Sequence, residues 1–138
     1  MIKTNSKLYE ALYVSTIAPN APLSVVADIA ARSRAWNSTQ AITGLLIFDG
    51  MRFCQQLEGA QKEVLALIER ISIDSRHTDV TIFHHGRLPQ RRFKNFALAF
   101  TDVTEIGDIE VLARLEKLDG QSGVSAFEEL VDTLDLRS

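Results

Sequence analysis

The sequence has little cysteine, proline or tryptophan: one cysteine, three prolines and one tryptophan in 138 residues. The single cysteine, Cys54, excludes an intrachain disulfide and fits a reducing compartment. No apolar run is long enough to span a bilayer. The N-terminus also lacks the apolar core and the cleavage site of a signal peptide. We therefore expect a cytoplasmic protein without a membrane-spanning segment.

The sequence also lacks a strong excess of charge of either sign. Fifteen lysines and arginines stand against eighteen aspartates and glutamates, for a net charge of −3, so nothing indicates a nucleic-acid binder. The three histidines, His77, His84 and His85, lack the spacing of a metal site. Neither a nucleophile elbow nor a phosphate-binding glycine loop is present, so no enzyme class is indicated.

The apolar pattern predicts an α+β fold whose first six elements run β-α-β-β-α-β, as in ferredoxin-like proteins. The first strand is apolar on both faces, which indicates a central strand covered on both sides. Asp49-Gly50 predicts a hairpin turn, and Gly59 is expected to end the strand that follows it. In order, the expected elements are a strand 8–15, a helix 24–37, strands 42–49 and 52–58, a helix 60–72, a strand 80–84 and a fifth strand 96–101.

Two helices are expected to close the chain. The first begins near Asp108 and ends at Gly120, and the second begins at Ser125, where Glu128 completes a capping box. Right-handed crossovers would place the helices 24–37 and 60–72 on one sheet face. The two closing helices would then cover the second face, so residues 1–102 and 103–138 are expected to form one unit.

One buried polar residue is anomalous in this pattern. Phe53, Gln55 and Leu57 share a strand face, because side chains alternate with period two, so Gln55 places an amide in the core. A buried amide without partners costs about 1–3 kcal/mol. The neighbouring first strand offers the phenol of Tyr13 as a partner. Taken alone, the pair fits a structural hydrogen bond better than a functional site.

Three further polar residues have two readings each. Asn37 is either a C-cap at the end of its helix or an amide that faces the imide edge of a heterocycle. Arg76 and His77 belong either to a solvated connector or to a charged rim for a phosphate-bearing ligand, whose anion suits an arginine fork. The residues alone leave these alternatives open.

Five segments, in this order, resemble the BLUF domain, the flavin-binding blue-light sensor of bacteria. The resemblance covers about residues 8–102. The segments are Leu12-Tyr13-Val14-Ser15; Trp36-Asn37 with Ile42-Thr43-Gly44-Leu45-Leu46; Phe53-Cys54-Gln55-Gln56-Leu57-Glu58-Gly59; Asp74-Ser75-Arg76-His77-Thr78-Asp79-Val80; and Arg91-Arg92-Phe93.

The resemblance implies a photoreceptor that is not an enzyme and that holds a flavin between its first two helices. FAD is the usual cofactor of the family, and FMN can occupy such sites. By position, Tyr13 resembles the redox-active tyrosine, Gln55 the glutamine that bridges it to the flavin, and Asn37 the amide on the ring's imide edge. The implied apolar lining is Ile29, Phe53 and Ile71, and the implied ribityl and phosphate end is Asp74, Arg76 and His77.

The sequence departs from the family on the fifth strand and before Asn37. Phe96 and Leu98 stand where the family often has a tryptophan and a methionine, so the usual exchange between those two residues has no counterpart here. Trp36 stands where a polar or basic residue is common. It either stacks near the flavin edge, where it would compete as an electron donor, or covers the helix end.

Two other classes of protein share this composition. One is an acylphosphatase-like hydrolase, although the loop 16–22 has no arginine or glycine cradle for an anion. The other is a regulatory domain that binds a small ligand without flavin. The photoreceptor hypothesis implies an unidentified protein partner or self-association, because no catalytic domain is attached.

Overall fold

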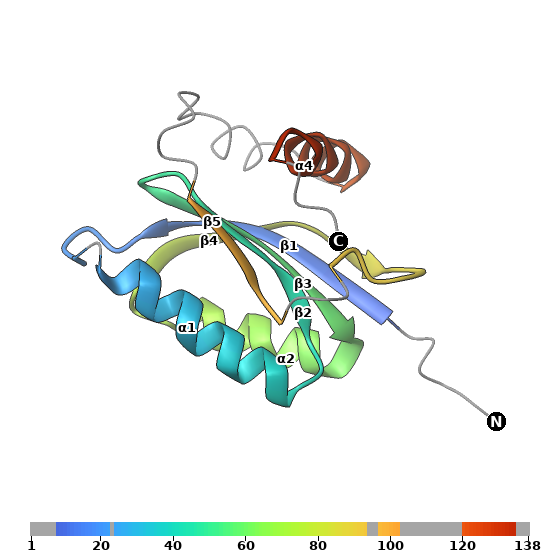
Figure 1. The fold of residues 1–138 in the computed structure, drawn as a ribbon, viewed down its shortest axis with the longest axis horizontal. Coiled ribbons are helices and arrows are strands. Elements are labelled where there is room, and N and C mark those ends of the chain that lie inside the picture. The colour runs from blue at the N-terminus through green and yellow to red at the C-terminus, as the bar shows by residue number, and fades with distance from the viewer. Residues whose placement is uncertain (1–7, 23, 94–96, 103–119, 135–138) are drawn as a thin grey trace.

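A five-stranded sheet in the order β4-β1-β3-β2-β5 forms the middle of the computed structural model (Figure 1). The structure describes residues 8–22, 24–93, 97–102 and 120–134. The strands are β1 (Leu8–Ile17), β2 (Thr43–Phe48), β3 (Arg52–Ala60), β4 (His77–Arg87) and β5 (Ala99–Asp102). The helices are α1 (Ser24–Thr39), α2 (Gln61–Ser72) and α4 (Gly120–Leu134).

The first six elements have the expected ferredoxin-like order, and β1 lies between β3 and β4. Both of these neighbours pair with β1 in antiparallel fashion, and β2 pairs antiparallel with β3. The short β5 pairs in parallel with β2 at the far edge. Because β1 and β3 are central, their side chains are buried on both faces, as a doubly covered strand requires.

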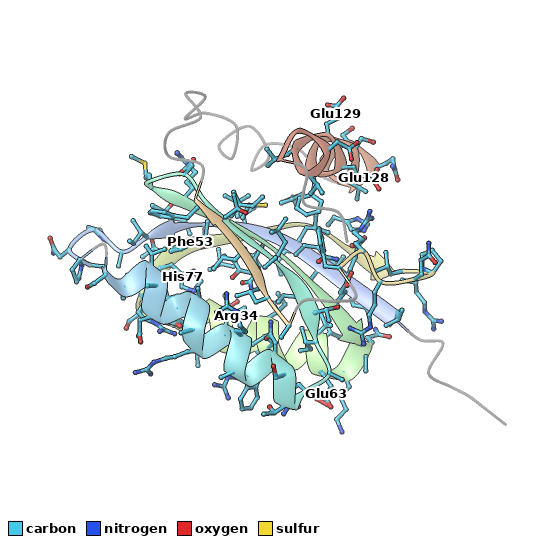
Figure 2. The ribbon with its side chains drawn as sticks, viewed as in Figure 1. Arg34, Phe53, Glu63, His77, Glu128 and Glu129 are labelled. Carbon is cyan, nitrogen blue, oxygen red and sulfur yellow. The ribbon has the colours of Figure 1, made fainter. Side chains whose placement is uncertain are left out.

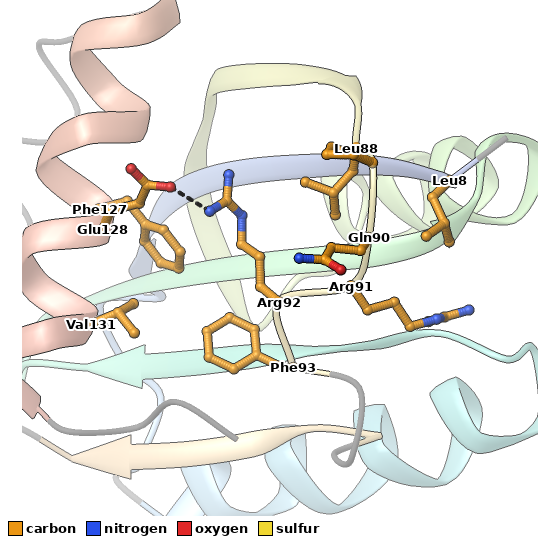
Figure 3. A pocket seen from close by; sticks show the side chains of 10 residues that line it. Leu8, Leu88, Gln90, Arg91, Arg92, Phe93, Phe127, Glu128 and Val131 are labelled. Carbon is orange, nitrogen blue, oxygen red and sulfur yellow. Dashed lines mark hydrogen bonds and ion pairs between the residues drawn. The ribbon is translucent and has the colours of Figure 1, made fainter. Parts of the chain in front are cut away.

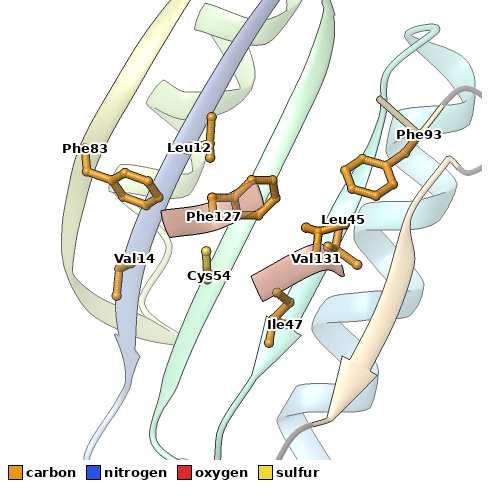
Figure 4. Packing of buried hydrophobic residues seen from close by; sticks show 9 residues of the cluster. All are labelled: Leu12, Val14, Leu45, Ile47, Cys54, Phe83, Phe93, Phe127 and Val131. Atoms are coloured by element: carbon orange, nitrogen blue, oxygen red, sulfur yellow. The ribbon is translucent and has the colours of Figure 1, made fainter. Parts of the chain in front are cut away.

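The helices cover the two faces of the sheet unequally (Figure 1): α1 and α2 lie on one face and α4 on the other. Beneath α2, a cluster contains Tyr9, Ala11 and Tyr13 of β1, and beneath α1 a cluster contains Phe48 and Phe53. Figure 4 shows the cluster on the opposite face, where α4 contributes Phe127 and Val131. The cluster consists of Leu12, Val14, Leu45, Ile47, Cys54, Phe83, Phe93, Phe127 and Val131.

Several boundaries differ from the sequence-based prediction. α1 continues to Thr39, two residues beyond Asn37. β3 passes through Gly59 instead of ending there, because a Cβ at Gly59 would lie 3.2 Å from the carbonyl oxygen of Ala41 and glycine permits this close approach.

The start of β4 was also wrong in the prediction. The segment expected as a polar connection already belongs to the strand from His77, which pairs with Ile17. β4 is an edge strand with a register shift between Val14 and Thr16 of its partner, and Asp79 has a φ of 54° nearby. Because edge strands tolerate polar residues and bulges, their sequences resemble loops.

For the closing helices, two predicted boundaries were wrong: a helix end at Gly120 and a helix start at Ser125. Gly120 begins α4 rather than ending a helix, and Ser125 lies inside α4 rather than at its start. Gly123 is buried against β4, where an added Cβ would come within 2.6 Å of the Phe83 ring. Gly123 therefore permits close packing of α4 against β4. The other closing helix, near 108–119, lies outside the described residues.

The fifth strand is shorter than expected. Residues 96–101 were predicted, and the strand comprises Ala99–Asp102, while Phe96 lies outside the described residues. Leu98 is buried in the cluster beneath α1, beside Phe53. Within the described ranges, no helix is long and apolar enough to cross a membrane.

Gly44 of β2 is the position where the sheet tolerates a side chain least. An added Cβ would lie 2.0 Å from the backbone carbonyl oxygen of Gln56, which cannot move without breaking the β2–β3 ladder. We expect Gly44→Ala to lower the free energy of unfolding by about 3 kcal/mol in urea denaturation. Gly86→Ala is the control, because its Cβ meets only the His84 ring at 3.8 Å. Equal losses in the two variants would contradict this prediction.

Candidate functional site

Tyr13 and Gln55 lie opposite each other on neighbouring strands, on the face that α1 and α2 cover. The Tyr13 hydroxyl donates a hydrogen bond to Oε1 of Gln55, and both side chains are almost fully buried. Burial raises the pKa of the Tyr13 phenol, and the nearby Cys54 thiol and Asp74 carboxylate act in the same direction. The phenol is therefore neutral, and the two donors of the Gln55 Nε2 remain for another group.

Asn37 lies within α1 and is completely buried. Its Nδ2 donates to the carbonyl oxygen of Ala97 at 2.9 Å, whereas its Oδ1 has no hydrogen-bond partner in the described structure. A buried acceptor without a donor costs about 1–3 kcal/mol. An N–H group of a ligand, such as a ring imide, would supply the missing donor. The C-cap reading is wrong, since the helix continues, and the reading as a ligand-facing amide stays a prediction.

Arg34, three residues before Asn37, was not predicted from the sequence. Its Nε donates to the carbonyl oxygen of Leu98 at 3.1 Å, so two α1 side chains hold consecutive residues of the segment before β5. The helical spacing of Arg34 and Asn37 indicates a shared helix face, but nothing in the sequence identifies their backbone partners.

The three residues expected to line the site fall into two adjoining clusters. Ile29 and Phe53 pack together beneath α1, with Leu98 in the same cluster. Ile71 packs against the cluster that contains Tyr13 beneath α2. The two clusters lie on one sheet face, under neighbouring helices, so an apolar ring between α1 and α2 would contact both.

Asp74, Arg76 and His77 lie together at the start of β4, as expected. The Arg76 guanidinium donates to both carboxylate oxygens of Asp74 and also reaches Asp28 of α1 at 3.4 Å. The hydrogen bond from Arg76 is the main reason that the pKa of Asp74 is lowered. Arg76 therefore joins the β4 start to α1 across the gap between the helices.

His77 is buried beside the Tyr13–Gln55 pair. Its ring lies 6.3 Å from the Tyr13 ring and contacts Phe53 edge-on at 6.0 Å, and Figure 2 shows Phe53 and His77 on the α1 side of the sheet. Burial lowers the pKa of His77, so the imidazole is neutral near pH 7. Its Nδ1 lies 2.8 Å from Oγ of Ser15, a buried partner that the sequence did not indicate.

Trp36 lies on the surface of α1. The Arg70 guanidinium of α2 stacks 4.0 Å from the centre of its indole, so the pair bridges the two helices. A cation over an indole stabilises the contact and makes removal of an electron from that ring less favourable. The contact favours the covering role of Trp36 over that of an electron donor.

A cavity of about 770 Å³ lies elsewhere, on the α4 face of the sheet (Figure 3). Its walls are the 88–93 loop and α4, so it does not touch the Tyr13–Gln55 pair. In the described part of the chain, no group of histidine, cysteine or acidic side chains could hold a metal ion.

Comparison with known proteins bears directly on this arrangement. The profile of the BLUF family, described as "Sensors of blue-light using FAD", matches residues 8–99. The chain is 27% identical over 92 residues to the "Blue light- and temperature-regulated antirepressor BluF" of Escherichia coli (strain K12). That match covers 67% of this chain and 23% of the relative, so the chain spans about a quarter of that protein.

Solved structures agree with this result. "BlrB - a BLUF protein, dark state structure" is 25% identical with a TM-score of 0.75, covering 93% of this chain and 97% of that one. A structure of Klebsiella pneumoniae BlrP1 with FMN and cyclic diGMP is 29% identical with a TM-score of 0.67, covering 78% of this chain and 30% of that one.

The fold and the family match define the class as a flavin-dependent blue-light sensor domain. The chain belongs to the BLUF family. Flavin binding and blue-light sensing are therefore the general function of this domain.

The Asp74–Arg76 contact gives a prediction that needs no ligand. We expect Arg76→Gln to raise the pKa of Asp74 towards its ordinary value of 3.8, as measured by NMR titration of the carboxyl carbon. Since the pKa is lowered in the folded protein, the pair's contribution to stability is complete above the ordinary value and disappears as the pH falls through the lowered pKa. Arg32→Gln is the control, since the Arg32 guanidinium pairs with Asp28, four residues before it on α1. An unchanged Asp74 titration in Arg76→Gln would refute the assignment.

Proposed function

We propose that this chain binds flavin noncovalently between α1 and α2 and that Tyr13 and Gln55 form its light-sensitive pair. The observation that carries the proposal is the buried Tyr13–Gln55 hydrogen bond on the same covered face as the unpartnered Oδ1 of Asn37. The buried Asn37 acceptor is costly in a protein without a ligand, because it lacks a donor. A flat ring with an N–H edge and a carbonyl would satisfy the Gln55 Nε2 and the Asn37 Oδ1 together.

The chemistry requires an electron donor and a proton path. A flavin bound between α1 and α2 would supply an electron acceptor that blue light activates. Tyr13 gives up the electron and then its phenolic proton, for which the hydrogen bond offers a path onto Oε1 of Gln55. The electron and the proton then return to Tyr13, so no net chemistry remains.

The change that persists after the electron and proton have returned is in the Gln55 side chain. When the electron and proton have returned, its amide has rotated or tautomerised and offers the flavin a different set of donors and acceptors. A stronger hydrogen bond to the flavin carbonyl shifts the absorption to longer wavelength. In this account Asn37 holds the imide edge, and Ile29, Phe53 and Ile71 pack against the ring.

For the cofactor we propose FAD, although FMN satisfies the same ring contacts. Asp74, Arg76 and His77 would lie at the ribityl and phosphate end. Arg76 already binds Asp74 and Asp28, so a phosphate would share its guanidinium with these carboxylates. Because these carboxylates partly neutralise Arg76, we expect the phosphate to be held weakly. The affinity for the cofactor would then depend mainly on contacts with the flavin ring.

For the output we propose a protein partner or self-association, without catalysis by this chain. One relative is named an antirepressor, and a BlrP1 structure contains cyclic diGMP, which shows that related domains occur in proteins with different outputs. We further propose that residues 103–138 form one unit with residues 1–102, since α4 contributes to the core.

The first test is optical. The purified protein, reconstituted with FAD, should show a flavin spectrum that shifts reversibly to longer wavelength under blue light. Tyr13→Phe and Gln55→Leu should each bind FAD and lose the shift, because one lacks the electron and proton donor and the other lacks the switchable amide. Absorption spectra before and after illumination measure both effects.

Tyr9→Phe is the matched control. Tyr9 lies on the same face of β1 and hydrogen-bonds to His85 instead of Gln55, so its variant should keep the shift. A wild-type protein that refuses flavin would refute the function, whereas a normal shift in Tyr13→Phe or Gln55→Leu would refute that residue's role alone.

A second test concerns the unpartnered acceptor. We expect Asn37→Ala to weaken flavin binding about tenfold, the loss of one hydrogen bond in a buried site, as measured by fluorescence titration. Ser38→Ala changes the next residue of α1, which is exposed and bonds only its own helix, and should bind flavin normally. Equal affinities for the Asn37 and Ser38 variants would count against the Asn37 contact.

A further inference from the structure

A network of buried charged and polar side chains lies on the sheet face opposite the Tyr13–Gln55 pair. Its centre is two carboxylates, Glu10 of β1 and Glu58 of β3, which are 2% and 0% exposed. Burying a carboxylate costs several kcal/mol unless it is paired. The photochemical account above does not use this network, so its presence needs another explanation.

Arg92 binds two separate elements at once. Its Nε and Nη2 donate to the two oxygens of Glu10 at 2.9 and 3.1 Å, and its Nη1 donates to Glu128 of α4 at 2.6 Å (Figure 3). The hydrogen bond to Glu10 is the main reason that the pKa of Arg92 is raised, so the guanidinium stays charged. The arginine therefore connects the central strand β1 to the helix α4.

Glu58 fixes the backbone that carries this arginine. Its two oxygens accept the backbone N–H groups of Arg92 and Phe93 at 2.7 and 2.9 Å. The Thr43 hydroxyl donates to the same carboxylate at 2.6 Å. A displacement of β3 at Glu58 would consequently move the 92–93 backbone and with it the Arg92 guanidinium.

Gln56 links the two carboxylates. Its Nε2 donates to Glu10 at 3.1 Å and to Glu58 at 2.9 Å, while its buried Oε1 has no partner in the described structure. The two carboxylates hold the amide in this orientation, because the reverse orientation would place oxygen against oxygen. The unpartnered Oε1 means that hydrogen bonding is incomplete here, so a rearranged Gln56 could gain a donor for this oxygen.

Gln56 is also the residue that follows Gln55 along β3. Its side chain projects to the α4 face while that of Gln55 projects to the α1 and α2 face, since strand side chains alternate. A rearrangement that shifts the backbone at Gln55 thus acts directly on a side chain in the network. The cavity that Arg92 and Glu128 line gives these side chains room to move.

We propose that Gln56 and the Glu10–Arg92–Glu128 chain transmit the state of Gln55 through the sheet to α4, and that the Arg92–Glu128 ion pair is the output contact. The inference rests on the proposed function, which supplies light as the input. In the dark the ion pair holds α4 on the sheet. In the lit state β3 shifts, Arg92 moves with it, and the Arg92–Glu128 contact weakens, which loosens α4 while Phe127 and Val131 stay in the core.

The test compares three FAD-loaded proteins: the wild type, Glu128→Gln and the matched variant Glu129→Gln. The measurement is hydrogen–deuterium exchange of the backbone amides over residues 120–134. Glu129 is the next residue of α4, and Figure 2 shows it on the side away from the sheet. In Glu128→Gln, Arg92 keeps its bidentate contact with Glu10, so the buried carboxylate stays paired and the protein should fold.

The wild type and Glu129→Gln should exchange α4 amides faster under blue light than in the dark. Glu128→Gln should exchange them about tenfold faster already in the dark, because a charge-assisted hydrogen bond is lost, and light should add nothing. Its flavin red shift should equal that of the wild type.

Two results would overturn the proposal without touching the photochemistry: a normal red shift with no light effect on α4 in the wild type, or an undiminished light effect on α4 in Glu128→Gln. A wild type without a red shift would overturn the proposed function, and the light-driven coupling with it. The spectrum and the exchange data therefore separate the two failures.

Discussion

The antiparallel register between β1 and β3 is the constraint on which both sides of the molecule depend. Tyr13 lies opposite Gln55, so the phenol and the amide meet on the face beneath α1 and α2. The same register brings Glu10 and Glu58 together across the strands on the other face. A slip of one strand by one residue would move each of its side chains to the other face of the sheet. The β1–β3 register therefore fixes both the Tyr13–Gln55 pair and the Glu10–Glu58 pair.

Because these polar groups are buried, a small rearrangement of their hydrogen bonds changes the free energy of the protein substantially. In a low-dielectric interior, a hydrogen bond is stronger and an unsatisfied group more costly than in water. Among the described residues, the buried acceptors without a donor include the Oδ1 of Asn37 on one side of the sheet and the Oε1 of Gln56 on the other. Central strands with unsatisfied polar groups on both sides suit a sensor, since a single amide rearrangement alters several bonds, whereas a fully satisfied core would resist it.

Much of the fold follows from local patterns. The apolar faces of β1, the turn at Asp49-Gly50 and the apolar stripe of α2 correctly identified the central strands and one covering helix. The errors fall where tertiary packing overrides local preference. The polar start of β4 forms a strand because it pairs with the end of β1, and the glycine-containing start of α4 is helical because Gly123 packs against Phe83.

The sequence by itself determined which residues share a strand face, and hence that the Gln55 amide is buried, because period-two alternation is a local property of the chain. It could not identify Ser15 as the partner of His77, or Arg92 as the link between Glu10 and Glu128. These partners are separated by 36 to 82 residues. Only the tertiary structure decided them, because strand order, register and helix placement together bring such residues within hydrogen-bonding distance.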